Sequence, residues 1–505
     1  MKNIKLLISI TSTIFAFGSS AVLTFFLTPI LINSIGFEAF SFYPLTNNFI
    51  NFISLIIVSI STTSTRHIKN SMSKGSRSET IELFSTSFFL NSFFSIIILI
   101  IFIPISFNLE RIINIPVTLT KDVIFLFVMT ILSITIRFYS TSFGTVIYLN
   151  EDLYLRALSE LVMNFVKIVS LGILFLNFNP SIVFIGISNI LMSITLFSFN
   201  FIYYLKYSYL YPLKTKYFNF IYVKKIVFSG FWNSINQLGM LIIYTSAITI
   251  ANITLGVEFS SYIPLFLFFP LFVQSLSSIT TSVFFPRMIR QFNTKNEFII
   301  SKDLNFLFLT NILITIPLLV SFIYFSRSFY GLWTPNVNVE LLLIHSNFTS
   351  IYTIIIVFFL PLTYIIIVED KQKIPGIVSI IFGILNIIIT YILMRFTNFG
   401  LYSSTVLLLV LTSIYFGIFL PFYSLIDHKN LVKKIYFKFI SNLIAIFLSF
   451  EVITFLNLNK SISSWIDFLL NFILVCFVTL TFLVVSYLFE INIKKIKKLF
   501  SRYLI

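Results

Sequence analysis

Long apolar runs, separated by short polar or charged breaks, recur along the whole chain. Most runs reach about 18 residues, enough for a helix to cross about 30 Å of hydrocarbon. Lipid offers the backbone no alternative hydrogen-bond partner, and no run alternates like the strand of a membrane barrel. The pattern therefore predicts an all-α polytopic membrane protein with about fourteen transmembrane helices. They are expected near residues 8–33, 44–64, 82–104, 123–147, 157–177, 182–205, 228–251, 262–283, 304–326, 341–367, 374–396, 401–422, 439–457 and 465–489.

Residues 35–45 and 255–265 carry the same pattern, with Gly, Glu, Ser, Pro and Leu at identical offsets and an apolar run on each side. Repeated halves are the sequence mark of many transporters that work between two lobes. We therefore predict two duplicated six-helix lobes and a helix pair outside the duplication. Gly36 and Gly256 are expected at matching sharp turns on the periplasmic side, where glycine tolerates positive φ. The predicted parts are an amino-terminal lobe (1–205), a cytoplasmic linker (206–227), a second lobe (228–422), and two extra helices with a basic cytoplasmic tail (423–505).

Composition and charge fit a membrane chain and exclude a soluble one. Hydrophobic residues make up 58% of the chain and charged residues 10%, against about 25% charged in ordinary globular domains. With the amino terminus in the cytoplasm, 27 of the 34 Lys and Arg fall on the cytoplasmic side, a strong positive-inside asymmetry. The net charge of +16 is thus a topology signal and an attraction to anionic lipid, and no nucleic-acid partner is expected. The predicted location is the cytoplasmic (inner) membrane, with both termini in the cytoplasm.

The chain carries no recognisable catalytic, nucleotide or metal motif. Its 14 glycines form no phosphate-binding loop followed by Lys-Ser/Thr, so ATP is not expected to drive it. The three histidines are scattered, and the single cysteine allows neither an internal disulfide nor a Cys-based metal site. We expect no enzyme activity, no cofactor and no metal, which leaves the interior of the helix bundle for function.

Two cations lie near the middle of predicted spans. Arg137 is in the fourth span and Lys167 in the fifth, and Glu160, Asn164 and Lys167 share one helical face. A charge at that depth costs about 2.5–3.5 kcal/mol on insertion scales and usually faces a cavity. One interpretation is a wet, net-positive cavity for an anionic substrate. The other is a structural ion pair between Glu160 and either Arg137 or Lys167.

Amide side chains form polar stripes on other predicted spans. Either these stripes line a water-filled path, or they hydrogen-bond between packed helices at about 0.6–2 kcal/mol each. Their occurrence in both halves favours the cavity interpretation. The stripes comprise Asn47 and Asn51 in the second span, Asn233, Asn236 and Gln237 in the seventh, and Gln274 in the eighth.

Several short motifs occur in a fixed order along the chain. They are Thr28-Pro29, Ile35-Gly36-x-Glu38-x-x-Ser41-x-Tyr43, Phe285-Pro286-Arg287, Glu369-Asp370-Lys371-Gln372-Lys373-Ile374-Pro375, and a span with Asn386 that ends at Asn398-Phe399-Gly400. Their order and spacing cover roughly residues 10–485 and are more specific than any one motif. The set resembles that of bacterial polysaccharide flippases in the multidrug/oligosaccharidyl-lipid/polysaccharide exporter superfamily, and within it the O-antigen and capsule repeat-unit (Wzx-type) flippases.

This resemblance implies two six-helix lobes around a cavity that opens alternately inward and outward. The implied substrate is an oligosaccharide repeat unit on undecaprenyl pyrophosphate, flipped from the cytoplasmic to the periplasmic leaflet for surface polysaccharide assembly. Arg137 and Lys167 would hold the pyrophosphate, while Asn233, Asn236, Gln237 and Gln274 would contact sugar hydroxyls. Membrane lipid, a coupled proton or sodium ion and a polysaccharide polymerase are the other partners expected. The first span (8–33) has no Arg or Lys, which departs from the lipid II flippases of the superfamily.

Two other functions compete with this one. A drug or metabolite antiporter of the same superfamily, driven by sodium or protons, would have a cavity acid suited to cation exchange, whereas the deep charges here are mostly positive. A membrane polysaccharide polymerase would have a large external catalytic loop and no duplicated halves, and the sequence shows the reverse.

The topology makes a direct prediction. In a background in which Cys476 is replaced by serine, single cysteines placed near both termini and within 66–80 and 206–225 should react with impermeant reagents from the cytoplasmic side only, because the positive charges stay there. Labelling of the carboxyl terminus from outside would contradict the fourteen-span topology.

Overall fold

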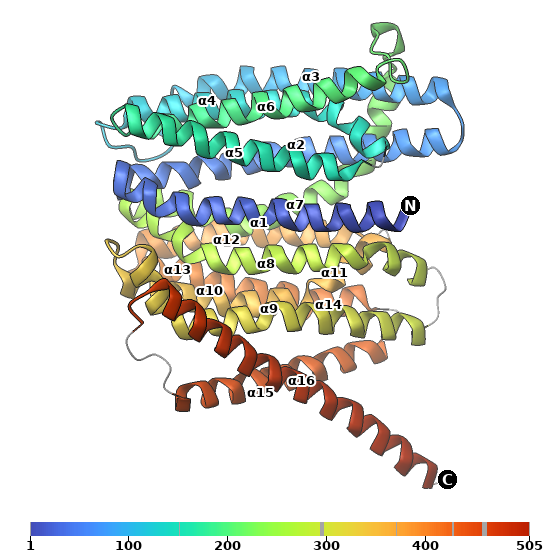
Figure 1. The fold of residues 1–505 in the computed structure, drawn as a ribbon, viewed down its shortest axis with the longest axis vertical. Coiled ribbons are helices and arrows are strands. Elements are labelled where there is room, and N and C mark those ends of the chain that lie inside the picture. The colour runs from blue at the N-terminus through green and yellow to red at the C-terminus, as the bar shows by residue number, and fades with distance from the viewer. Residues whose placement is uncertain are drawn as a thin grey trace. The chain divides into compact units, whose positions relative to one another are not determined.

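A computed structural model shows a helical membrane protein (Figure 1). It describes residues 2–150, 152–292, 297–369, 371–426, 429–456 and 462–503. Within these ranges, the side chains of 2–11, 13–14, 56–59, 153, 229–230, 233, 282–303, 429–430 and 490–503 lie outside the description. Fourteen helices of the described part are long and apolar enough to cross a membrane. The predicted fold class, an all-α polytopic protein with about fourteen spans, is confirmed.

The helices group into two compact units by contact. The first unit contains residues 1–263 and 372–400, and the second contains 264–371 and 401–505. The two lobes predicted from the sequence duplication, 1–205 and 228–422, remain a prediction. The same holds for the linker (206–227) and the final segment (423–505).

The first unit is a bundle in which α4 packs on both α3 and α6, α5 on α1 and α6, and α7 on both α2 and α12. The boundary between the units falls inside α8, after Ile263. The helices of this unit are α1 (Lys2–Ile35), α2 (Phe37–Ser73), α3 (Arg77–Ser106), η1 (Leu109–Arg111), α4 (Thr120–Leu149), α5 (Leu153–Asn177), α6 (Val183–Tyr207), η2 (Thr215–Tyr217), α7 (Phe220–Thr254), the start of α8 (Val257–Phe292) and α12 (Lys373–Phe396).

The second unit contains two predicted spans that are interrupted. The predicted helix 341–367 is divided at Pro361, and the predicted helix 401–422 contains a π-helical turn before Pro421. Proline lacks a backbone N–H, so it begins a helix more readily than it continues one. The unit contains the rest of α8, α9 (Glu297–Trp333), α10 (Val339–Phe359), α11 (Pro361–Val368), α13 (Tyr402–Thr412), η3 (Ser413–Phe419), α14 (Leu420–Ser424), α15 (Lys429–Leu456) and α16 (Trp465–Tyr503).

The repeated segments form matching turns, as the sequence predicts. Gly36 has φ 89° and Gly256 has φ 101°, both in the left-handed region that favours glycine. The turns also contact each other within the first unit. The Ser261 hydroxyl donates to the Phe37 carbonyl at 3.0 Å, and the Phe37 and Tyr262 rings meet edge to face at 4.9 Å.

A second tie lies at the same end of the first unit. The loop after α3 is joined to the end of α7 by Asn114 and Asn252. The Asn114 backbone N–H donates to Asn252 Oδ1 at 2.8 Å, and Asn114 Nδ2 donates to the Asn252 carbonyl at 2.7 Å. Asn252 is fully buried, so this paired amide contact holds α7 to the α3–α4 connection.

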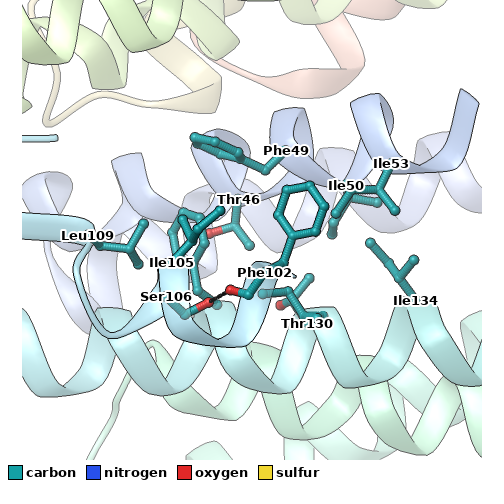
Figure 2. A pocket seen from close by; sticks show the side chains of 12 residues that line it. Thr46, Phe49, Ile50, Ile53, Phe102, Ile105, Ser106, Leu109, Thr130 and Ile134 are labelled. Carbon is teal, nitrogen blue, oxygen red and sulfur yellow. Dashed lines mark hydrogen bonds between the residues drawn. The ribbon is translucent and has the colours of Figure 1, made fainter. Parts of the chain in front are cut away.

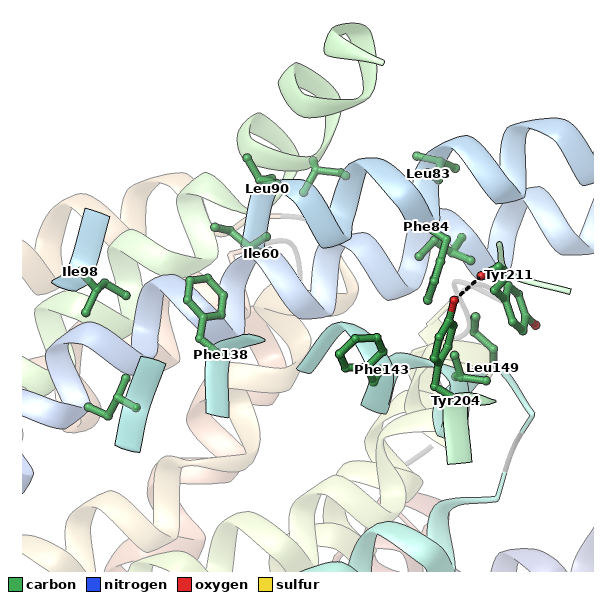
Figure 3. Packing of buried hydrophobic residues seen from close by; sticks show 14 of the residues in the cluster. Ile60, Leu83, Phe84, Leu90, Ile98, Phe138, Phe143, Leu149, Tyr204 and Tyr211 are labelled. Atoms are coloured by element: carbon green, nitrogen blue, oxygen red, sulfur yellow. Dashed lines mark hydrogen bonds between the residues drawn. The ribbon is translucent and has the colours of Figure 1, made fainter. Parts of the chain in front are cut away.

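The opposite end of the first unit has an aromatic core, which Figure 3 shows in part. Phe84 packs between Tyr204 and Tyr211, and the Tyr204 hydroxyl donates to the Tyr211 carbonyl at 3.1 Å. Tyr211 belongs to the predicted linker. The linker is therefore packed at its start, where its first residues fold back onto α3 and α6.

A small apolar gap lies between α2, α3 and α4 (Figure 2). Its volume is about 20 Å³, close to the room that a single water needs. The Ser106 hydroxyl beside it donates to its own helix, to the Phe102 carbonyl at 2.9 Å. Thr46, Ser106 and Thr130 contribute hydroxyl groups to an otherwise apolar lining, and the gap has too little room to act as a substrate site.

Small residues let α7 and α12 approach closely. A Cβ at Gly239 would collide with both the backbone and the side chain of Ser379. The Asn386 amide then donates to the Ile243 carbonyl at 3.1 Å and to Ser246 Oγ at 3.0 Å. Close backbone approach with interhelical amide bonds is how membrane helices associate without a hydrophobic driving force.

This contact predicts a difference between two glycine substitutions. Gly239→Ala should destabilise the protein by about 1–3 kcal/mol, because α12 backbone must move to make room. Gly172→Ala, where a Cβ meets nothing within 4 Å, is the matched control and should not lower stability. Thermal denaturation in detergent, followed by size-exclusion chromatography, measures both. Equal midpoints for the two variants would contradict the close α7–α12 contact.

Candidate functional site

The first unit holds a cavity of about 580 Å³ among α1, α2, α4, α5 and α6. Its lining is rich in hydroxyl and amide groups. The polar residues that line it are Ser20, Ser54, Ser61, Thr62, Thr65, Arg137, Thr141, Thr145, Tyr148, Arg156, Ser159, Glu160, Asn164 and Asn200. A space of this size and polarity is suited to a hydrated ligand.

The cavity occupies one half of the bundle. It runs from the middle of α4, at Arg137, to the connection between α4 and α5, at Tyr148 and Arg156. At a rise of 1.5 Å per residue, Arg137 lies about 18 Å along α4 from its last residue. This half is the one predicted to face the cytoplasm, and the Gly36 turn lies at the other end of α1 and α2.

Arg137 is the deepest charge of the cavity lining. Among the residues that the structure describes, it makes no hydrogen bond or ion pair. Glu160 and Arg156, both on α5, are the charged groups near enough to act on it electrostatically. The guanidinium therefore keeps its five N–H donors available to the cavity.

Glu160 forms an ion pair that differs from both pairings considered from the sequence. Its Oε1 lies 3.3 Å from Nε of Arg156, one turn earlier on α5. The Arg156 guanidinium also lies over the Tyr148 ring, 5.1 Å from its centroid. Arg156 is a site residue that sequence reasoning missed, because its place next to a predicted loop marked it as a topology charge. Its spacing of four residues from Glu160 was the available signal.

Lys167 lies outside the cavity lining, between α5 and α2. Its side chain is buried, with 8% exposed. Its Nζ lies 3.4 Å from the Tyr43 hydroxyl and 5.3 Å from the centre of the Tyr43 ring. Lys167 and Tyr43 therefore form one polar contact between α5 and α2. Asn47 is half-buried on α2, one turn after Tyr43.

Asn164 connects the cavity wall to the first helix. Its Nδ2 donates to Ser19 Oγ at 2.9 Å and to Ser20 Oγ at 2.8 Å. Asn164 is 8% exposed. This residue both lines the cavity and holds α5 against α1.

The other residues proposed from the sequence are not on this lining. Asn51 is exposed on α2, and Asn236 and Gln237 are half-buried on α7. The Asn236 carbonyl accepts from the Ser379 hydroxyl of α12 at 3.3 Å. Gln274 belongs to the second unit, and its Oε1 is buried without a hydrogen-bond partner among the described residues. The side chain of Asn233 lies outside the description. Their membership of a common site with Arg137 stays a prediction.

No metal centre is found among the described side chains: nowhere in that part of the chain do three or more His, Cys, Asp or Glu come together in a group able to hold an ion. His345, in the second unit, is buried, and its Nδ1 lies 3.1 Å from Thr405 Oγ1. This histidine therefore acts in helix packing.

The chain is similar in sequence to a bacterial membrane protein and in fold to several solved transporters. It is 26% identical over 425 residues to the uncharacterized membrane protein EpsK of Bacillus subtilis strain 168, covering 83% of each chain. No protein-family model matches the chain. At this identity, the similarity supports a multi-pass membrane protein distantly related to EpsK.

Solved structures share the fold. An inward-facing multidrug resistance MATE family transporter of the MOP superfamily superposes with a TM-score of 0.67 at 14% identity, over 82% of this chain and 95% of that one. An outward-facing MATE transporter gives 0.63 at 15%, over 86% and 99%. A MOP superfamily transporter from Pyrococcus furiosus gives 0.60 at 13%, over 86% and 94%. The chain thus has the fold of the MATE transporters of the MOP superfamily.

The buried Lys167 contact predicts coupled effects on stability. Tyr43→Phe should cost about 1 kcal/mol by removing the hydroxyl, and Tyr43→Leu about 2 kcal/mol more by removing the ring from the cation. In a Lys167→Met background, the difference between the Phe and Leu variants should shrink. Thermal unfolding of the four single and double variants, with both parents, tests this double-mutant cycle. Strict additivity would show that the ring does not stabilise the charge.

Proposed function

We propose that this protein flips undecaprenyl-pyrophosphate-linked oligosaccharide repeat units from the cytoplasmic to the periplasmic leaflet by alternating access, for surface polysaccharide assembly. The anionic pyrophosphate binds in the cavity of the first unit. The sugars contact its hydroxyl and amide groups, and the isoprenoid chain stays in lipid.

The observation that carries this proposal is Arg137. It lies at mid-span on a polar cavity and has no partner among the described residues. A charge at that depth is costly unless water or a ligand compensates it. An anion bound there gains charge-assisted hydrogen bonds in a medium that screens them weakly. The arrangement is therefore suited to an anionic substrate.

The charge of the cavity argues against the main alternative. Two arginines and one glutamate line it, and the glutamate is already paired with Arg156. A drug or cation antiporter needs an acid that is available to its substrate. Within the described lining, Glu160 is the one acid, so the cavity has an excess of positive charge.

The similar solved structures support a transport function and are compatible with a positively charged cavity. Similar solved structures include both inward-facing and outward-facing conformations of a MATE transporter. The Pyrococcus furiosus transporter is described as having a binding pocket of reverse polarity, which suggests a different function for it. Pocket charge thus varies within this fold, and it is the feature on which we base the substrate class.

The proposal predicts the effect of replacing Arg137. Arg137→Ala should abolish surface polysaccharide display in a strain that depends on this gene, because one phosphate contact of about 1.5–3 kcal/mol is lost. Arg137→Lys should keep part of the function if charge alone matters, and little if a bidentate grip is required. Surface polysaccharide is measured by immunolabelling, and protein level by blotting of membranes.

Arg327→Ala is the matched control, because Arg327 is an exposed arginine paired with Glu340 at 2.7 Å in the second unit. It should display normal polysaccharide. An Arg137→Ala/Lys167→Ala double variant that is normally expressed and fully active would rule out the anion site.

A further inference from the structure

We propose that Glu160 is an internal counter-ion that the substrate displaces, so that Arg156 and Arg137 together bind a diphosphate group. The inference rests on the proposed function, which it extends in two ways. It adds Arg156 to the binding site, and it gives Glu160 the role of a built-in competitor for the anion.

The ion pair on α5 is built so that it can open. Both side chains are solvent-accessible, with 56% of Arg156 and 38% of Glu160 exposed, and both line the cavity. Their contact is a single long bond of 3.3 Å between Nε and Oε1. An exposed pair of this kind contributes little to stability, so exchanging its carboxylate for a stronger anion costs the fold little.

Arg156 keeps its best anion-binding groups free. Glu160 is bonded to Nε alone, and within the described part of the chain the two terminal amino groups of the guanidinium have no hydrogen-bond partner. Those groups are the fork that binds a phosphoryl group bidentately. The Tyr148 ring, 5.1 Å from the guanidinium carbon, stays in contact with Arg156 when Glu160 leaves. The arginine is therefore held in position independently of its carboxylate.

Arg137 supplies the second cation. It projects from α4 into the same cavity, and its interaction with Glu160 is favourable while that with Arg156 is unfavourable. Without a ligand, Glu160 therefore reduces the repulsion between the two arginines. A diphosphate carries enough charge to neutralise both guanidiniums, one phosphoryl group to each. It would then repel Glu160, which is free to turn into the open part of the cavity.

The chemistry selects a diphosphate over a single phosphoryl group. The two arginines come from different helices, and a diphosphate can offer a separate phosphoryl group to each guanidinium. An orthophosphate competes poorly with Glu160, which already neutralises one arginine. The free energy for displacing the carboxylate thus comes from engaging both cations at once.

The experiment is calorimetric titration of the purified full-length protein in detergent with inorganic pyrophosphate. Glu160→Gln should bind pyrophosphate at least about tenfold more tightly than the unaltered protein, since the competing carboxylate is gone. Arg156→Gln should bind at least about tenfold more weakly. In Arg156→Gln/Glu160→Gln, the gain from Glu160→Gln should disappear. Orthophosphate should bind weakly to each of these proteins.

Glu340→Gln is the matched control, because it breaks the exposed Arg327–Glu340 pair of the second unit and should leave pyrophosphate binding unchanged. Unchanged or weaker binding by Glu160→Gln, in a protein with an unaltered thermal midpoint, overturns the inference. So does orthophosphate binding as tight as that of pyrophosphate.

Failure of this inference is distinguishable from failure of the proposed function. If Glu160→Gln leaves binding unchanged while Arg137→Ala still abolishes surface polysaccharide, the counter-ion role is wrong and the flippase proposal stands. If pyrophosphate binds as expected while both Arg137 variants display normal polysaccharide, the site binds diphosphates for a different purpose.

Discussion

Water is absent from the centre of a membrane, and every charge placed there must find compensation within the protein or in a hydrated cavity. The first unit meets this constraint in three ways within about three turns of α5 and the facing part of α4. Lys167 is placed against the face and hydroxyl of Tyr43. Arg156 is neutralised by Glu160. Arg137 is directed at a polar cavity and meets no carboxylate at bonding distance among the described residues.

These solutions differ in what they leave for a ligand. Lys167 is buried and its contact joins two helices, so it stabilises the wall of the bundle. Arg156 and Arg137 both line the cavity, and Glu160 is the one acid of its described lining. The same residue type can therefore serve packing or binding, and the difference lies in whether the surrounding side chains close over the charge. Depth in the membrane identifies a charge as unusual without telling which role it has.

The sequence was sufficient to predict the transmembrane helices because hydropathy measures directly the apolar surface that lipid requires. The turns at Gly36 and Gly256 were identifiable because they need positive φ. Partners of polar side chains were harder to predict. Periodicity placed Glu160, Asn164 and Lys167 on one helical face, but a face of α5 meets both the cavity and α2. Consequently Asn164 and Lys167, three residues apart, have different neighbours. Arg156 was counted among the cytoplasmic charges that set the topology, because a charge in a cytoplasmic loop and a charge at the mouth of a cavity look alike in a sequence. Asn386, which the sequence marked only as part of a motif, is a packing residue, since Gly239 admits the backbone of α12 at close range.

The two ends of the first unit differ in the contacts between their helices, and this difference bears on transport. At one end the duplicated turns contact each other through Phe37, Ser261 and Tyr262, and Asn114 ties the neighbouring loop to buried Asn252. Towards the other end the cavity extends from Arg137 to Arg156. An anion that enters from this second end meets Arg156 and its carboxylate before it reaches Arg137. Because Arg137 lies deeper, at mid-span, the anion moves inward only if binding to both arginines is more favourable than binding to Arg156 alone. The ion pair with Glu160 meets this condition, because it lowers the affinity of Arg156 for an anion until the ligand can contact both arginines.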